Sequence, residues 1–383
     1  MKLNTMVGAR GVACVIFGAA CLGFAETGNA QGKVLKEKGA KTTDLTAKQK
    51  DSLEVARGLK RARVSEPLFG AASPLEVTLT TDIRRIRGDK GDKAPWRSAV
   101  VTYTEASGKA VAIATQIRTR GIWRLNNCFF PPLKLNFKSE VTKGTLFQGL
   151  DKPKLVNFCR DNDQYDQYII QEMQLYRVYN LLTPASHRAR LLSLTYQDGQ
   201  SGKIYAKRSA LLIEEAEVMA ARLGGPVVDI KGAVARDLEP HHDALISLFQ
   251  YFIGNTDFSI NALHNVELVG QSSGDYVPVA YDFDFSGAID ASYATTDPKL
   301  PIRRVRDRLF RGYCRPAEDY AKAIATFNEK RGAIYALYSD SIGRMLRPKT
   351  VRETLGYYDD FYKTINDPRR LKREIMDDCV KTE

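Results

Sequence analysis

Two short polar stretches, N-T-D-F at residues 255–258 and Y-D-F-D-F at residues 281–285, could do chemistry on a phosphate group. The first follows an apolar run that is typical of a helix, and it leads to Asn265, which directly precedes a short apolar strand. The second follows the next apolar strand. The chain thus presents an acid, an amide and a second acid in this order along a helix, a loop and two strands. Phosphotransferases position a catalytic base and the ligands of a metal ion in this way.

In that arrangement Asp257 is the expected base, near the hydroxyl group that accepts the phosphoryl group. Asn265 and Asp282 are the expected ligands of Mg²⁺ or Mn²⁺, and Asp284 is either a second ligand or the true first one. Mg²⁺ prefers hard oxygen ligands and takes several from phosphates and water, so one or two protein ligands are enough. Asn261 is the alternative amide; we favour Asn265 because a strand follows it directly. Each of these residues could instead simply cap a turn.

The wider sequence resembles the CotH family of spore-coat protein kinases and their Gram-negative relatives. The resemblance covers roughly residues 75–315. It is based mainly on F-Q-Y-F-I-G-N-T-D at residues 249–257 and V-P-V-A-Y-D-F-D at residues 277–284. R-T-R-G at residues 118–121 and P-L-K-L-N-F-K at residues 132–138 add a further match upstream.

The resemblance implies an α+β, two-lobed, atypical protein-kinase-like fold, with an antiparallel-sheet N-lobe and a mainly helical C-lobe. It also implies transfer of a phosphoryl group from ATP, with Mg²⁺ or Mn²⁺, to a hydroxyl group of an acceptor protein. Lys134 and Arg120 are the candidates for nucleotide contacts, and Glu172 is the candidate partner of Lys134. The spacing of eight residues from Asp257 to Asn265 departs from the five of ordinary protein kinases.

Two other functions are compatible with the same residues. A chain that kept this fold without turnover would be a pseudokinase or an envelope scaffold. A nucleotidyl (AMP) transferase would use similar acids. A Ser/His/Asp hydrolase is not supported, because the sequence has no G-x-S-x-G stretch. The sequence does not identify the acceptor protein, although an acidic or Ser/Thr-rich protein would suit the predicted site.

Composition and charge narrow the class of protein. The chain has 383 residues, of which 44% are hydrophobic and 27% charged, so it is globular and long enough for two lobes. A formal net charge of +12 suits a nucleotide, an acidic protein substrate or an anionic envelope surface. No nucleic-acid-binding motif is present, so nucleic acid is not an expected partner.

The N-terminus predicts export. Residues 1–25 have a basic start and an apolar stretch at 11–25 that is too short to span a bilayer, as in a signal peptide. Small residues favour cleavage after residue 25 or residue 30. We therefore expect a bacterial periplasmic or secreted protein. Lipidation of Cys21 is not expected, because Gly18 replaces the large aliphatic residue of lipoprotein signals.

Removal of the signal peptide leaves four cysteines, and an even number in an oxidising compartment predicts disulfides. Four cysteines allow three pairings. We favour Cys128–Cys159, since both cysteines flank the same predicted sheet region, together with Cys314–Cys379. No C-x-x-C stretch is present and the histidines are scattered, which excludes the usual zinc spacings.

The expected organisation is a flexible arm at residues 26–65, an N-lobe at 66–215 and a C-lobe at 216–383 that ends in a helical cap. The backbone near residues 213–215 is the expected hinge that meets adenine. The arginine-dense segment 303–311 either lines the phosphate side of the site or forms a basic helix surface. Alternating apolar residues predict strands at 76–80, 99–104, 110–117, 133–137, 155–158, 191–196, 203–213, 266–269 and 277–281. Helical periodicity or composition predicts helices at 165–182, 217–223, 244–253, 320–327, 334–346 and 351–365.

Overall fold

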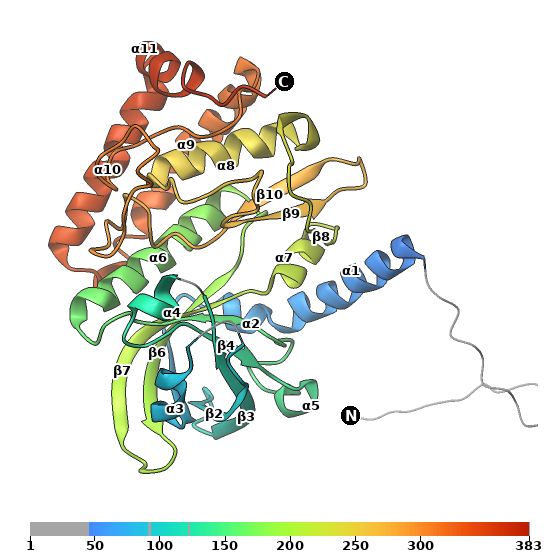
Figure 1. Ribbon diagram of the computed structural model, residues 1–383, viewed down its shortest axis with the longest axis vertical. Helices are drawn as coiled ribbons and strands as arrows, with labels where there is room; N and C mark the ends of the chain where they lie inside the picture. Colours follow the sequence, from blue (N-terminus) through green and yellow to red (C-terminus); the bar gives the residue numbers. More distant parts are fainter. Residues whose placement is uncertain (1–45, 91–92, 122, 383) are drawn as a thin grey trace, which may run out of the picture. The chain divides into compact units, whose positions relative to one another are not determined.

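The computed structural model describes residues 46–90, 93–121 and 123–382, which are shown in Figure 1. Their helices and strands belong to one unit, Leu45–Glu383. The expected signal peptide and the first part of the expected arm, up to residue 45, lie outside the described residues. Within these described ranges, no helix combines the length and the apolar character that a membrane span needs.

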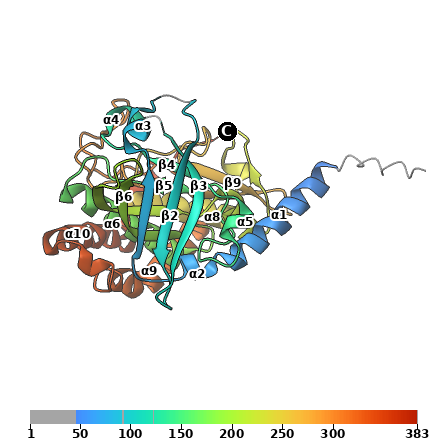
Figure 2. The same cartoon turned by 90° about the horizontal axis from the view of Figure 1, so that it is seen from below.

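Seven strands close into a barrel in the order β1-β2-β3-β4-β5-β7-β6, which Figure 2 shows from below. Neighbouring strands pair antiparallel with one exception: β1 and β6 run parallel and close the barrel, with Leu75 opposite Leu192. The strands are β1 (Leu75–Thr81), β2 (Arg97–Thr104), β3 (Ala110–Thr119), β4 (Leu133–Asn136), β5 (Lys154–Val156), β6 (Ala189–Asp198) and β7 (Ile204–Ile213).

This closed, mixed barrel contradicts the expected two-lobed kinase-like fold with an antiparallel-sheet N-lobe. Hairpin signals in the sequence report only on strands that follow one another, and these strands do pair antiparallel. The parallel pair joins distant segments, as the hydrogen bond between the side chains of Thr80 and Gln197, 117 residues apart, illustrates. Alternating residues of β1, such as Val77 and Leu79, are buried, so the closure lets the barrel enclose an apolar core.

A second, three-stranded sheet has the order β10-β9-β8 and lies with the helices of the C-terminal half (Figure 1). Its strands are β8 (Val227–Val228), β9 (Val266–Gly270) and β10 (Tyr276–Ala280). The long helix α6 (Asp163–Leu182) runs between the barrel and α8 (Pro240–Ile253), as Figure 1 shows. The other helices are α1 (Ala47–Val64), α2 (Glu66–Phe69), α3 (Ile83–Gly88), α4 (Trp123–Asn127), α5 (Ser139–Thr142), α7 (Ala216–Arg222), α9 (Ala317–Ala336), α10 (Pro348–Asn366) and α11 (Pro368–Leu371). Short 3₁₀ turns at Ala235–Asp237 and Gly343–Met345 and a π turn at Lys372–Met376 complete the described elements.

The helix α8 positions the loop that contains Asp257. It begins after Glu239, whose carboxylate accepts hydrogen bonds from the N–H groups of the first turn, and Pro240 occupies the first helical position. It ends at Gly254, which has a φ of 64° and caps the helix in the left-handed conformation. An added Cβ at Gly254 would lie 1.9 Å from the hydroxyl oxygen of Tyr357, so glycine is required for close packing as well.

The helix α1 occupies the second half of the expected flexible arm. Thr46 and Gln49 form a reciprocal capping box at its start. Gly58 and Ala62 are buried four residues apart, so they share one face of the helix. A Cβ on Gly58 would lie 2.4 Å from the Cβ of Ala221, so α1 packs closely on α7. The arm is therefore ordered from residue 46 onward.

Both favoured disulfides are confirmed. Cys128 bonds to Cys159, and Cys314 bonds to Cys379. The first links the end of α4 to the chain just before α6, and the second links the C-terminal segment to the chain that precedes α9. Two disulfides are compatible with the oxidising compartment that the sequence predicts.

Candidate functional site

The end of the β9–β10 hairpin brings together two of the predicted ligands. Asn265 directly precedes β9, Asp282 lies two residues after β10, and Val266 faces Ala280 across the hairpin. The N–H of Tyr281 donates to the carbonyl oxygen of Asn265 at 3.1 Å. Asn265 and Asp282 both adopt the left-handed conformation, with φ of 53° and 63°, which Asn and Asp tolerate better than most residues. Both residues therefore lie at the same end of the hairpin.

Asp257 lies in the loop between α8 and β9 and contacts Asn265 directly. Nδ2 of Asn265 donates to the carbonyl oxygen of Asp257 at 2.8 Å and to its Oδ2 at 3.1 Å. Nε2 of His264 lies 2.8 Å from Oδ1 of Asp257. The N–H of Asp257 donates to the side-chain oxygen of Asn255 at 3.0 Å. The side chain of Asp257 remains 41% exposed, so a substrate can reach it.

The structure also distinguishes between the two candidate amides. Asn261 is exposed in the same loop, and its carbonyl oxygen accepts a hydrogen bond from the N–H of Gly232 at 2.8 Å. In the described part of the chain, no hydrogen bond joins Asn261 to Asp257. Asn265 is therefore the amide that lies beside the candidate base, as the strand that follows it suggested.

Three carboxylates gather behind the hairpin end, between α6 and the loop after β10. Asp284 is buried, and its Oδ2 accepts a hydrogen bond from the hydroxyl of Tyr293 at 3.0 Å. Glu172 of α6 is also buried, and neither of its carboxylate oxygens has a hydrogen-bond partner among the described residues. Burial and the neighbouring Asp282 raise the pKa of Asp284 to about 7. Burial, Asp284 and Asp282 raise the pKa of Glu172 well above its usual value.

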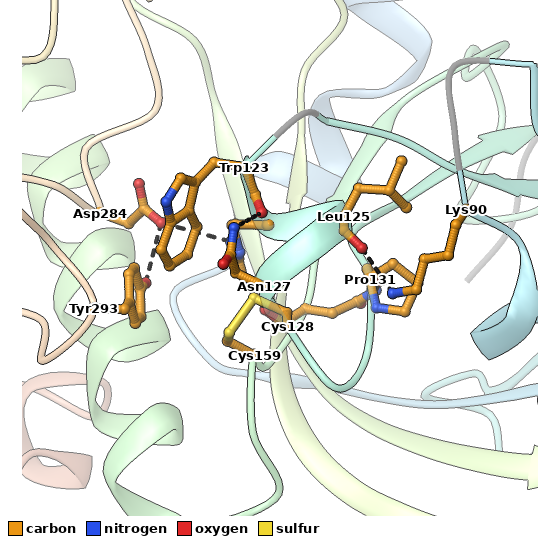
Figure 3. The surroundings of a disulfide bond; sticks show 11 residues. Lys90, Trp123, Leu125, Asn127, Cys128, Pro131, Cys159, Asp284 and Tyr293 are labelled. Atoms are coloured by element: carbon orange, nitrogen blue, oxygen red, sulfur yellow. Dashed lines mark hydrogen bonds and ion pairs between the residues drawn. A yellow bond between two sulfur atoms is a disulfide. The ribbon is translucent and has the colours of Figure 1, made fainter.

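A positive charge reaches this cluster from α4. Nη1 of Arg124 lies 3.8 Å from Oδ2 of Asp284, and Nη2 of Arg124 donates to the carbonyl oxygen of Asn157. Cys128 directly follows α4 and bonds to Cys159; Figure 3 shows this disulfide together with Asp284 and Tyr293. No local pattern in the sequence points to Arg124, because only the folded chain places it beside the acids.

A cavity of about 1050 Å³ lies next to the hairpin on the side of the barrel. Its volume is in the range of pockets that hold small organic ligands and cofactors. The helix α1, the strands β4 and β5, the connection from β7 to α7 and the strand β9 all contribute to its wall. Charged residues line much of it, among them Arg57, Arg61, Lys134, Lys154, Glu214, Glu215 and Glu267.

Lys154 of β5 connects this cavity to the hairpin. Its Nζ lies 3.6 Å from Oε1 of Glu267 and 4.0 Å from the centre of the Tyr281 ring, and its side chain remains 31% exposed. Lys134, on the neighbouring strand β4, faces Lys154 in the register and lines the same cavity. The expected pair of Lys134 with Glu172 is not formed: no ion pair joins them in the described part of the chain. Sequence reasoning missed Lys154, which lies just outside the strand that we predicted.

The charges around Lys154 make this part of the cavity suitable for an anion. Burial lowers the pKa of Lys154, and the cations of Arg120 and Lys134 lower it further, while Glu267 and Asp282 act in the opposite direction. Arg120 follows β3, so three cations come from three neighbouring segments of the barrel. Their mutual repulsion would be relieved by a bound phosphate group.

Glu267 is fixed on its other side by His187. Nε2 of His187 lies 2.9 Å from Oε2 of Glu267, and Nδ1 of His187 lies 3.0 Å from the carbonyl oxygen of Glu214. His187 belongs to the segment that leads into β6, whereas Glu267 belongs to β9. This hydrogen-bonded chain therefore ties the barrel, the β7–α7 connection and the hairpin together around the cavity.

The donor atoms at the hairpin end suit a magnesium ion that also binds phosphates. Among the residues that the structure describes, no group of three or more His, Cys, Asp or Glu side chains forms a complete metal site. Asn265 and Asp282 nevertheless offer two oxygen ligands, and phosphate oxygens and water commonly supply the others. The buried carboxyl group of Glu172 lies behind them, and burial beside Asp284 and Asp282 raises its pKa well above the usual value. These residues fit a nucleotide-bound cation rather than a cation held by protein alone.

Comparison with protein families and with curated proteins finds no significant match. The resemblance to the CotH family therefore stays a prediction from the quoted motifs, and the chemistry has to be argued from the site.

Proposed function

We propose that this protein transfers the γ-phosphoryl group of ATP to a hydroxyl group of an acceptor protein. The observation that carries the proposal is the contact of Asp257 with Asn265 at the hairpin end where Asp282 also lies. Glu267, two residues after Asn265, lines a cavity of about 1050 Å³. An accessible acid, an amide and a second acid beside a pocket of nucleotide size form the combination that phosphoryl transfer needs.

The cavity would hold the nucleotide. Lys154, Lys134 and Arg120 supply positive charge for the phosphates, since Lys154 lies between the cavity and the hairpin. The base would lie toward the β7–α7 connection, where Glu214 and Glu215 line the cavity. Of the lysines, Lys154 is the stronger candidate for a phosphate contact, because Glu267 and Tyr281 hold it in place, whereas the sequence favoured Lys134.

Asn265 and Asp282 would hold Mg²⁺ or Mn²⁺, with the buried carboxyl groups of Asp284 and Glu172 behind them. Such an ion neutralises charge on the transferring phosphoryl group and orients the β- and γ-phosphates. We place Asp282 before Asp284, because Asp284 is buried and already accepts a hydrogen bond from Tyr293.

Asp257 would act on the acceptor. Its carboxylate takes the proton of the acceptor hydroxyl as the hydroxyl oxygen bonds to the γ-phosphorus. The bond between the γ-phosphorus and the bridging oxygen breaks, and ADP leaves with that oxygen. His264 and Asn265 hold the carboxylate by hydrogen bonds to its two oxygens, which fixes its direction toward the acceptor.

The acceptor is expected to be an acidic or Ser/Thr-rich protein. The chain has a formal net charge of +12, which attracts acidic proteins over a distance that shortens as salt is added. An exported enzyme also requires a source of ATP outside the cytoplasm, so the acceptor and the nucleotide must meet the protein in the same compartment.

The test is to incubate the purified protein with γ-labelled ATP, Mg²⁺ or Mn²⁺, and an acidic protein acceptor. The wild-type protein should label itself or the acceptor, and Asp282→Asn and Asp257→Asn should each reduce labelling on the order of a hundredfold or more. Asp229→Asn is the matched control, because Asp229 is exposed on the loop after β8. All three variants should keep the melting temperature of the wild type within a few degrees.

Mass spectrometry of the reaction products distinguishes the alternatives. A phosphate adduct supports the kinase, whereas an AMP adduct would replace it by a nucleotidyl transferase. The absence of any adduct, together with no thermal shift on adding ATP and Mg²⁺, would reject nucleotide chemistry and favour an envelope scaffold.

A further inference from the structure

Arg311 binds the two carbonyl groups on either side of the candidate base. Its Nη1 donates to the carbonyl oxygen of Thr256 and, at 2.9 Å, to that of Phe258. Its guanidinium carbon also lies 5.6 Å from the centre of the Phe258 ring. The residue between these two carbonyl groups is Asp257. One side chain thus fixes the backbone of the base on both sides.

The segment around Arg311 is itself held firmly. Phe310 is buried, and Gly312 packs so closely on α8 that an added Cβ would lie 2.3 Å from the Cβ of Ser247. The disulfide between Cys314 and Cys379 follows three residues after Arg311. Arg311 therefore extends from a fixed backbone to the Asp257 loop.

The Asp257 loop needs such support. Leu263 and Asn265 both have a φ of 53°, a conformation that costs energy for residues other than glycine and persists only when neighbours enforce it. The N–H groups of Ser259 and His264 each donate to the other's carbonyl oxygen at 2.9 Å, so the loop closes on itself. The side chains of Asn255 and Asn265 bind the N–H and the carbonyl oxygen of Asp257 itself. Arg311 adds the contacts to the carbonyl oxygens of the residues before and after it.

We propose that Arg311 is a positioning residue, which holds Asp257 in the geometry that phosphoryl transfer needs; this inference rests on the proposed function. An arginine suits the role because its planar guanidinium keeps its charge and offers several donors in a fixed fork. Carbonyl oxygens carry partial negative charge, so the interaction is charge-assisted. A shift of about 1 Å in a reacting group can reduce the rate on the order of a hundredfold.

The other arginines of this segment serve different purposes. Arg308 donates to the carbonyl oxygens of Tyr251 and Phe252 at 3.0 and 3.1 Å, so it holds the end of α8. Arg304 is 81% exposed and pairs with Asp307 on the surface. Arg304 therefore offers a matched control: it lies in the same segment and carries the same charge, but it does not contact the Asp257 loop.

The experiment compares Arg311→Gln, Arg311→Lys and Arg304→Gln in the labelling assay with varied ATP. In Arg311→Gln, kcat should fall on the order of a hundredfold, while the KM for ATP changes by less than about twofold. Arg311→Lys should recover part of this loss, because it keeps the charge but not the fork. Arg304→Gln should match the wild type. An unchanged kcat in Arg311→Gln, or an equal fall in Arg304→Gln, would overturn the proposal.

Amide hydrogen exchange gives a second readout that does not depend on turnover. In Arg311→Gln the amides of Asp257, Ser259 and His264 should exchange faster, while those in the middle of α8 keep their wild-type rates. Unchanged exchange at Asp257 would overturn the inference even if labelling fell. If the amides of Arg311→Gln exchange faster but the wild-type protein labels nothing, the contact is supported and the proposed function is rejected. The two failures can therefore be told apart.

Discussion

Arg124 and Arg311 approach the candidate site from two different parts of the chain, and each lies close to a disulfide. Arg124 lies four residues before Cys128, and its guanidinium approaches the carboxylate of Asp284. Arg311 lies three residues before Cys314, and its guanidinium binds backbone carbonyl groups around Asp257. The same type of side chain therefore serves two purposes: Arg124 balances buried charge, and Arg311 fixes backbone geometry.

Because the two arginines serve different purposes, their removal should affect different properties of the protein. The contribution of Arg124 is electrostatic, because it is the cation beside the buried Asp284 and its neighbour Glu172, whose pKa values are both raised. Its removal should mainly change the free energy of unfolding. The contribution of Arg311 is geometric, because carbonyl oxygens keep their partial charge at every pH. Its removal should mainly change kcat.

Replacement of Arg124 by Met should have the largest effect on stability. A buried charge that loses its partner typically costs about 3–5 kcal/mol of stability, and Asp284 and Glu172 would then lack their nearby cation. Urea denaturation should show this loss in Arg124→Met. Adding Asp284→Asn to Arg124→Met should recover part of it, since the carboxylate that Arg124 approaches then disappears.

Arg84→Met is the control for this measurement, because Arg84 is exposed on α3. Its free energy of unfolding should stay within about 0.5 kcal/mol of the wild type. If Arg124→Met loses less than about 1 kcal/mol, the electrostatic role of Arg124 is wrong.

The two disulfides test the same comparison through the stability of the two regions. They close loops with sequence separations of 31 residues for Cys128–Cys159 and 65 residues for Cys314–Cys379. Loop-closure entropy predicts a loss of about 4 kcal/mol for either pair replaced by Ser, and a loss about 0.6 kcal/mol larger for the longer loop. Urea denaturation of the two double variants measures both losses.

The two bridges should also differ in how they affect the Asp257 loop. Replacement of Cys314 and Cys379 should speed amide exchange at Asp257, because Arg311 lies on that segment. Replacement of Cys128 and Cys159 should not. The opposite pattern would show that the support of the Asp257 loop comes from the barrel side instead.

The sequence predicted those features that depend on residues close together in the chain. The candidate base and its amide, Asp257 and Asn265, are joined by one loop, and Asp282 follows the next strand, so a hairpin suffices to bring them together. Most strands and helices were predicted within a few residues for the same reason. One exception is α9, a single helix from Ala317 to Ala336, whereas the sequence predicted helices at 320–327 and 334–346; residues 337–342 lie in turns instead.

The features that the sequence did not predict depend on contacts between distant segments. The parallel pairing of β1 with β6 closes the barrel, yet neither strand carries a local signal of its partner. Arg124 and Lys154 look like ordinary surface cations in the sequence, and Arg311 stood out only as part of the arginine-dense segment 303–311. Only the fold places them beside Asp284, Glu267 and the Asp257 loop. The expected pair of Lys134 with Glu172 failed because Glu172 lies among acids instead.

The smallest predicted effect concerns pH and the segment that contains Arg311. Nε of Arg315 lies 2.7 Å from Oδ2 of Asp243 in α8, and Oδ1 of Asp243 has no hydrogen-bond partner among the described residues. Burial raises the pKa of Asp243 to about 6, although Arg315 acts in the opposite direction; Glu239 raises it slightly more. The unfolded chain therefore releases this proton at lower pH than the folded protein does.

The stability that Asp243 contributes should accordingly be present below about pH 4 and should be lost as the pH rises to about 6. Relative to the wild type, Asp243→Asn should gain at most about 3 kcal/mol over this interval and nothing further above it. Urea denaturation of both proteins at several pH values gives the difference. A difference that stays constant from about pH 4 to 7 would mean that Asp243 is ionised throughout. Arg315 would then hold α8 without any dependence on pH, as Arg311 holds the Asp257 loop.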